Sequence, residues 1–166
     1  MSDMPALDLV VHDERFGRVH VTGDGGRITV SGEQVPGCEV TRTSPEPARA
    51  DVPIGTREGA ELTAALSGRP GTLTPGPGRL TRGSYRVDAE FDGDQYRLAP
   101  VTATASRLSV NGTAVGELDT QPLHATWQDA VRAEHAAVGY LLLASFGAGA
   151  RRMPGLLLES LTQYQG

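Results

Sequence analysis

One stretch near the end of the printed sequence decides the fold and carries no charged side chain: Ala136-Ala137-Val138-Gly139-Tyr140-Leu141-Leu142-Leu143-Ala144-Ser145-Phe146. Eleven helical residues extend about 16 Å, whereas the hydrocarbon core of a bilayer is about 30 Å thick, so the stretch is too short to span a membrane. A helix that is apolar on every side must be covered by protein on most sides. In a chain of 166 residues, we expect a β-sheet to cover it.

The apolar stretch belongs to a longer expected helix, and a second helix should follow it. Thr126 and Asp129 resemble a capping box with Asp in place of the usual Glu, which predicts a helix over 127–146. The glycines at 147 and 149 should end this helix. Pro154 is typical of the first turn of another, shorter helix. The buried side of this second helix would carry Leu156, Leu157, Leu158 and Leu161.

The first thirty residues show the period-2 alternation of a half-buried hairpin. Its apolar members are Leu9, Val11, Val19 and Val21. A three-residue loop over 15–17, with its glycine in a left-handed conformation, would join the two strands. In that register Glu14 faces Arg18. His12 then faces His20 on the same side of the hairpin.

The middle of the chain has weaker patterns. A third strand is expected over 27–31, and the prolines between 33 and 57 predict irregular chain or a short edge strand at 38–42. Residues 58–67 could form a short helix. The Gly/Pro-rich segment 68–83 predicts a linker or mobile internal loop.

A second β block precedes the helix. Alternation over 85–91 and a turn at 92–94 predict one hairpin, and Asn111-Gly112 within 107–118 predicts another. We expect roughly seven to nine strands in total. The predicted fold class is α+β, in one domain over 1–166: an antiparallel curved sheet or a closed β-barrel around the apolar helix, followed by the second short helix.

The hairpin of residues 107–118 followed by a fully apolar helix resembles the Tubby C-terminal, LURP-one and phospholipid-scramblase group. The resemblance covers 84–146 and is one of pattern. It implies a closed β-barrel threaded by a hydrophobic helix, with twelve strands. It also implies a non-catalytic binding module, which in some members of the group recognises anionic lipid headgroups.

The composition limits the classes of partner and the cellular location that can be expected. The net charge of −5 argues against a general basic surface for nucleic acid. All fifteen basic residues are arginines, a bias typical of a high-GC genome such as that of an actinobacterium. The single cysteine, Cys38, cannot form an internal disulfide, and the first nine residues lack the features of a signal peptide, so a cytoplasmic location is expected. The sequence contains no motif for a cofactor, so we expect the protein to have no cofactor.

Glu134 and His135 are the candidates for catalysis. At helical spacing, Glu134 falls on the same face as Val131 and Val138, where a carboxylate must be paired, hydrogen-bonded or protonated. It could act as a general acid or base at a barrel mouth, or as the counter-charge of a ligand. The alternative is that this part of the helix protrudes and Glu134 meets solvent or an arginine.

Two further groups are candidates for binding. Arg151 and Arg152 precede the final helix, where guanidinium groups and free N–H donors could bind phosphate or carboxylate. His12, His20 and Glu14 could hold zinc or iron, although polar faces of antiparallel sheets usually meet water. A second basic run comprises Arg79, Arg82 and Arg86.

These observations predict a non-catalytic module that binds a partner protein or a small amphiphilic or anionic ligand, with Glu134, Arg151 and Arg152 as ligand-binding candidates. The competing hypothesis is a small enzyme of specialised metabolism with an acid/base site at Glu134 and His135. An enzyme requires a deep pocket with converging polar groups. A module whose helix fills its barrel has no room for one.

Overall fold

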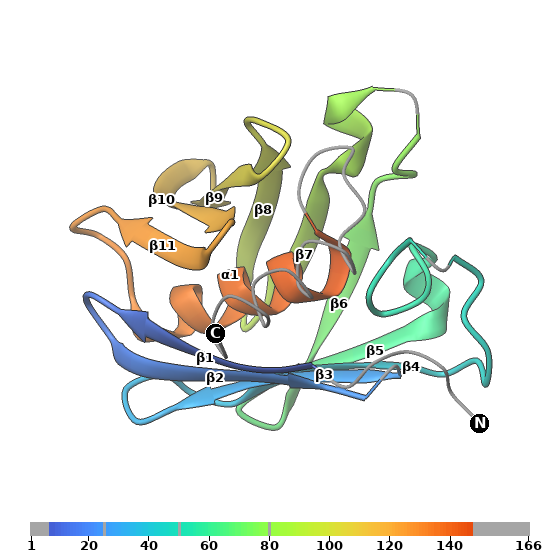
Figure 1. Cartoon of the computed structure of the whole chain (residues 1–166), viewed down its shortest axis with the longest axis horizontal. Helices are drawn as coiled ribbons and strands as arrows, with labels where there is room; N and C mark the ends of the chain where they lie inside the picture. Colours follow the sequence, from blue (N-terminus) through green and yellow to red (C-terminus); the bar gives the residue numbers. More distant parts are fainter. Residues whose placement is uncertain (1–6, 25, 50, 80, 148–166) are drawn as a thin grey trace.

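The computed structural model describes residues 7–24, 26–49, 51–79 and 81–147 (Figure 1). In this part of the chain, one antiparallel sheet contains eleven strands, and their order in space is their order in the sequence. The strands are β1 (Leu7–Asp13), β2 (Gly17–Gly23), β3 (Arg27–Gly32), β4 (Cys38–Arg42), β5 (Leu62–Leu66), β6 (Arg69–Pro75), β7 (Val87–Phe91), β8 (Asp94–Pro100), β9 (Ala105–Val110), β10 (Thr113–Thr120) and β11 (Leu123–Trp127).

The sheet curves into a nearly closed β-barrel, which confirms the predicted fold class. Strands β1 to β5 form one wall and β7 to β11 the other (Figure 1). Strand β6 belongs to both walls, because residues 69–71 pair with β5 and residues 72–75 pair with β7. The two edges of the sheet, β1 and β11, are in contact where the barrel closes.

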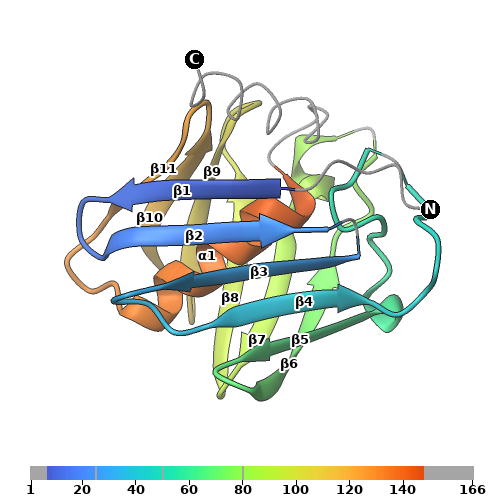
Figure 2. The same ribbon diagram turned by 60° about the horizontal axis from the view of Figure 1, so that its bottom comes forward.

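The helix α1 (Ala133–Phe146) lies inside this barrel and crosses behind β1 to β4 in Figure 2. Every residue from His135 to Phe146 is buried, as predicted for the apolar stretch. The strands turn alternate apolar residues toward the helix; in β1 these are Leu7, Leu9 and Val11. No helix in the described ranges is long and apolar enough to cross a bilayer.

The expected start of the helix was wrong. Trp127 ends β11, and α1 begins at Ala133 rather than at 127. The helix is capped by residues at this later start, where the Arg132 backbone N–H donates to Nδ1 of His135 at 3.1 Å. Thr126 and Asp129, the predicted capping residues, precede the helix and do not cap it. The expected second helix and its leucines lie outside the described residues.

The register of the first hairpin also differs from the expected one. Asp13 pairs with Gly17, so His12 faces Arg18 and His20 faces Val10. Gly17 is left-handed, as predicted. The register shifts because the loop is 14–16: Asp13 is the last inward-facing residue of β1 and its carboxylate binds the loop backbone.

Residues 58–75 contain two of the three strands that the sequence pattern missed; the third is β11. The expected helix over 58–67 is instead a single 3-10 turn, η1 (Gly59–Glu61), followed by β5. The expected loop over 68–83 begins with β6 and ends in a second 3-10 turn, η2 (Arg82–Tyr85). Ser67 and Gly68, both with positive φ, form the tight turn between β5 and β6.

The structure contains the strand predicted at 38–42 and both hairpins predicted in the second β block. The strand at 38–42 exists as β4, although it is paired on both sides by β3 and β5 and is not an edge strand. The hairpins around 92–94 and 111–112 are β7–β8 and β9–β10. Asn111 and Gly112 have the positive φ values that this turn requires.

One end of the barrel is closed by the connection between β4 and β5. Its residues 52–57 are all buried, and we name them the plug segment. The Ile54 backbone N–H donates to the Ser145 carbonyl at 3.1 Å, which ties the plug segment to the last turn of α1. The C-terminal end of the helix is therefore covered by protein.

Candidate functional site

Two charged side chains are buried in the described part of the chain, Asp13 and Arg57, with exposed fractions of 6% and 7%. Burying a charge is costly unless it is paired or well hydrogen-bonded. The surroundings of each residue therefore indicate whether its charge serves the fold alone.

Asp13 lies at the end of β1 and joins three parts of the barrel. Its Oδ1 accepts hydrogen bonds from the backbone N–H groups of Arg15 and Phe16, at 2.9 and 3.0 Å. Its Oδ2 accepts from Nε1 of Trp127 at 2.7 Å and from Oη of Tyr140 at 2.5 Å. The carboxylate thus connects the first hairpin to β11 and to α1.

The hydrogen bonds of Asp13 indicate a structural role. A carboxylate can accept about four hydrogen bonds, and Asp13 accepts four from the protein. Burial, with the bond to Asp13 as the next cause, raises the pKa of the Tyr140 phenol well above its usual range. Tyr140 therefore stays a neutral donor, and the cluster leaves no acceptor for a ligand.

Arg57 ends the plug segment at the C-terminal end of α1. Its Nη1 donates to the Gly76 carbonyl at 3.0 Å, and its Nη2 donates to the Phe146 carbonyl at 3.3 Å. The second carbonyl lies in the last turn of the helix, where the helix dipole places partial negative charge. The rings of Tyr85 and Phe146 lie 5.2 and 5.7 Å from the guanidinium carbon.

The guanidinium of Arg57 has no carboxylate partner among the described residues. Its buried Nε makes no hydrogen bond and lies against Gly78, where a Cβ would come within 2.7 Å of that atom. Burial, followed by the nearby positive charge of Arg49, lowers the pKa of Arg57 to about 10. Asp51, the neighbouring acid, is bound by Arg49 through both of its oxygens. The Arg57 site is therefore short of negative charge.

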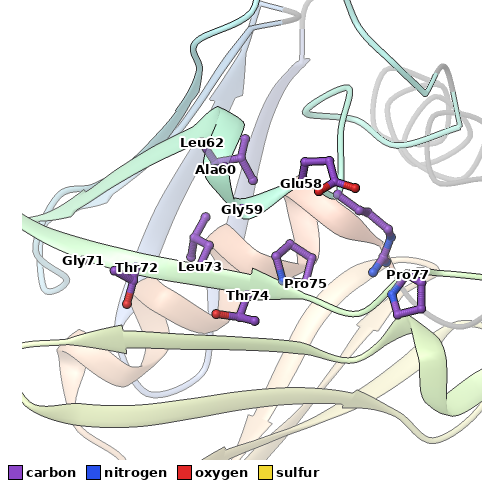
Figure 3. A pocket seen from close by; sticks show the side chains of 11 residues that line it. Glu58, Gly59, Ala60, Leu62, Gly71, Thr72, Leu73, Thr74, Pro75 and Pro77 are labelled. Atoms are coloured by element: carbon purple, nitrogen blue, oxygen red, sulfur yellow. The ribbon is translucent and has the colours of Figure 1, made fainter.

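A groove of about 630 Å³, open to solvent, lies beside Arg57 (Figure 3). Its apolar lining is contributed by Ala60, Leu62, Leu73, Pro75 and Pro77. Its polar lining is contributed by Arg57, Glu58, Thr72 and Thr74. The groove thus combines apolar walls, two hydroxyl groups and one charge of each sign.

The groove forms where the two walls of the barrel diverge. Strands β5 and β6 pair from Leu66–Arg69 to Ala64–Gly71, after which β6 leaves β5 and continues along β7. The turn η1 lies in the resulting gap, with Gly59 so close to the Leu73 carbonyl that a Cβ would come within 2.4 Å. Backbone from two strands and one turn therefore forms the walls of the groove.

Glu134 and His135 lie far along the helix from Arg57, in the first turn of α1. Glu134 is half-buried, whereas His135 is buried and packs its ring edge-on against Tyr96. Nδ1 of His135 accepts the Arg132 N–H, which fixes the ring as a helix cap. Burial lowers the pKa of His135. Tyr96 carries a buried hydroxyl that has no hydrogen-bond partner in the described structure.

The candidate metal ligands are not brought together. His20 faces Val10 and is bonded to Asp8, His12 faces Arg18, and Glu14 lies in the hairpin loop. Within the described ranges, no three His, Cys, Asp or Glu residues are placed to hold a metal ion. Arg151 and Arg152 lie outside the described residues.

Sequence reasoning missed Asp13 and Arg57 as buried charges. Asp13 could have been found, because it continues the inward alternation of Leu9 and Val11. Arg57 carries no such signal. Cys38 is buried, and burial raises the pKa of its thiol to about 12, which disfavours the reactive thiolate.

No protein-family model matches the chain, and neither a curated protein nor a solved structure is found to be similar to it.

Proposed function

We propose that the protein is a non-catalytic binding module that holds a segment of a partner protein in the groove beside Arg57. The observation that carries this proposal is a buried guanidinium without a carboxylate partner on the wall of an open groove. We place this function in the cytoplasm of an actinobacterial-type cell, on the composition described above.

The filled interior of the barrel favours binding over catalysis. Side chains of α1 occupy the space in which a barrel enzyme would hold its substrate, and Val138, Leu141 and Leu142 have no exposed surface. An amphiphilic ligand inside the barrel would need the same space. The alternative of an acid/base site at Glu134 and His135 is disfavoured, because one ring nitrogen of His135 is already used in the cap.

The shape of the groove favours a macromolecular partner. Small-molecule sites usually enclose most of their ligand, whereas this groove is open to solvent. An extended peptide can lie in such a groove, place apolar side chains against its walls and leave its other face in solvent.

The fold also supports a proposal about ancestry. A barrel threaded by an apolar C-terminal helix is the arrangement that the resemblance to the Tubby, LURP-one and scramblase group implies. We propose that the chain is a distant member with eleven described strands. The resemblance to this group implies a binding role rather than catalysis, which agrees with the proposed function.

A peptide-display selection on the full chain tests the proposal. A random dodecapeptide library would be enriched on the immobilised protein, and selected peptides would be titrated against Thr74→Trp and Thr126→Trp. Both threonines are exposed strand residues, but only Thr74 lines the groove. We expect Thr74→Trp alone to weaken binding, by roughly tenfold or more. Failure to enrich any peptide, or equal binding by the two variants, would overturn the proposal.

A further inference from the structure

Arginines gather around the groove end at which the plug segment closes the barrel. Arg49 donates to the carbonyls of Pro77 and Gly78, and Arg57 donates to that of Gly76. Three further arginines lie on the chain that follows: Arg79, Arg82 and Arg86. All three are exposed. This gathering contrasts with the net charge of −5 of the whole chain.

Four arginines elsewhere on the barrel have acidic partners. The ion pairs on the outer faces of the strands are Arg27–Glu39, Arg69–Asp92, Arg97–Asp88 and Arg107–Glu117. At the groove end, Arg49 pairs with Asp51 and Arg86 with Asp88. By contrast, Arg57, Arg79 and Arg82 have no carboxylate within ion-pair distance in the described part of the chain. Three of the five arginines at this end therefore have no acidic partner among the described residues.

Arg57 is the member of this group that a bound anion would stabilise most. A guanidinium has five N–H donors, and the protein uses two of them. Charge-assisted bonds from a guanidinium to a carboxylate are about twice as strong as neutral ones. Near a poorly hydrated cation, the attraction of an anion is also less screened than it is in bulk water.

We infer that the segment held in the groove is acidic and extended, with one carboxylate placed against Arg57 and further acidic residues facing Arg79 and Arg82. This inference rests on the proposed function and names the chemistry of its partner. The apolar walls at Leu62 and Pro75 hold the intervening side chains of the segment.

Concave geometry favours a peptide over the other polyanions. A bilayer surface is flat and cannot enter a groove to reach a side chain that is 7% exposed. A single extended polypeptide is narrow enough to enter and can present a carboxylate on a short stem.

Glu58 gives the groove selectivity. This exposed carboxylate lies on the groove wall next to Arg57 in the chain. A like charge on the partner at that point would be repelled, so the acidic residue of the partner must lie on the Arg57 side. The pattern of charges therefore sets the direction and the register of the bound segment.

Fluorescence anisotropy with two labelled probes tests the inference. The first probe is the tightest peptide from the display selection, and the second is the same peptide with each Asp and Glu replaced by Asn and Gln. We expect the acidic probe to bind the wild type roughly tenfold or more tightly than the amide probe. Arg57→Met should abolish this difference, and raised salt should reduce it.

Glu58→Gln keeps the inference testable if Arg57→Met does not fold, because residue 58 is exposed and its replacement leaves the core unchanged. This variant should bind the acidic probe more tightly than the wild type, whereas the distant control Glu90→Gln should not. Equal affinities for the two probes would overturn the inference and leave the proposed function standing. Tighter binding to phosphatidylserine vesicles or to an oligonucleotide than to the acidic probe would overturn it as well.

Discussion

Asp13 and Trp127 close the seam of the barrel: Oδ2 of Asp13 accepts a 2.7 Å hydrogen bond from the indole Nε1, although 114 positions separate the two residues. They end β1 and β11, the two edges of the sheet. The ring of Phe16 packs edge-on against the same indole. On the outside, the Arg15 guanidinium donates to the carbonyls of Gln128 and Asp129.

Replacing Asp13 by Asn should destabilise the barrel by about 3 kcal/mol, because the amide would present a donor where Trp127 and Tyr140 need an acceptor. Urea unfolding followed by far-UV circular dichroism measures the change. Asp8→Asn is the matched control, since Asp8 is an exposed acid of the same strand, and it should cost less than about 0.5 kcal/mol. Similar losses in the two variants would contradict a special role for the seam.

Leu142→Ala tests the packing of the central helix. Leu142 has no exposed surface, so the shortened side chain leaves a cavity that the surrounding strands can fill only in part. The expected loss in the free energy of unfolding is about 2 to 5 kcal/mol. Val101→Ala, at the exposed position next to β8, should cost less than about 0.5 kcal/mol. A loss below about 1 kcal/mol for Leu142→Ala would mean that the helix is not enclosed.

The central helix could be predicted because its signal is local. Uncharged residues over 136–146 require enclosure in any fold, and the alternation in β7 and β8 provides the wall. Residues 62–66 were misassigned because Leu62, Ala65 and Leu66 have the spacing of one side of a short helix, whereas Leu62, Ala64 and Leu66 have the alternation of a strand. Their pairing with β4 decides between the two, and that pairing is a contact between distant parts of the chain.

The candidate site could not be predicted for a similar reason. Arg57 is buried only because the plug segment folds over the end of α1, and nothing within residues 52–57 specifies that contact. The groove forms where β6 leaves β5. The sequence pattern identified neither segment as a strand, so it could not predict the groove. By contrast, Glu134 was noticed for its position on an apolar helix face, and the helix begins too late to enclose it.

The free energy of unfolding should decrease as the pH is lowered, and part of this decrease should depend on His135. Burial is the largest cause that lowers the pKa of its imidazole below the ordinary value of 6.5, while Glu134 acts in the opposite direction. The folded state therefore binds the proton less tightly than the unfolded chain does. This contribution to stability is fully present above the unfolded pKa and is lost as the pH falls toward the folded pKa. Protonation would also remove the acceptor that caps Arg132.

Urea unfolding at about pH 7.5 and about pH 5.5 measures this contribution. His135→Asn keeps an acceptor near the Arg132 N–H and does not titrate, so it should lose less stability than the wild type between the two pH values. His124→Asn, at an exposed position of β11, should retain the pH dependence of the wild type. Identical pH dependence in all three proteins would show that His135 is not held as described.

Arg57→Met separates a structural from a functional role of the buried guanidinium. Two effects on stability oppose each other. The variant leaves the Gly76 and Phe146 carbonyls without donors, which costs about 1 to 3 kcal/mol for a buried acceptor. It also removes a charge that has no carboxylate partner, and the desolvation penalty of one buried ion is several kcal/mol.

We expect these effects nearly to cancel, so that the free energy of unfolding of Arg57→Met stays within about 1 kcal/mol of the wild type. The same variant should lose its preference for the acidic probe. Urea unfolding and anisotropy on one preparation measure both quantities. Arg49→Met is the comparison, because Arg49 pairs with Asp51 and its loss leaves that acid unpaired near the same loop. If Arg57→Met instead loses several kcal/mol of stability and Arg57→Lys restores it, the two effects do not cancel and the cation stabilises the barrel as a cap of α1. The Glu58→Gln comparison then decides whether the groove also prefers the acidic probe, because that variant leaves the cap in place.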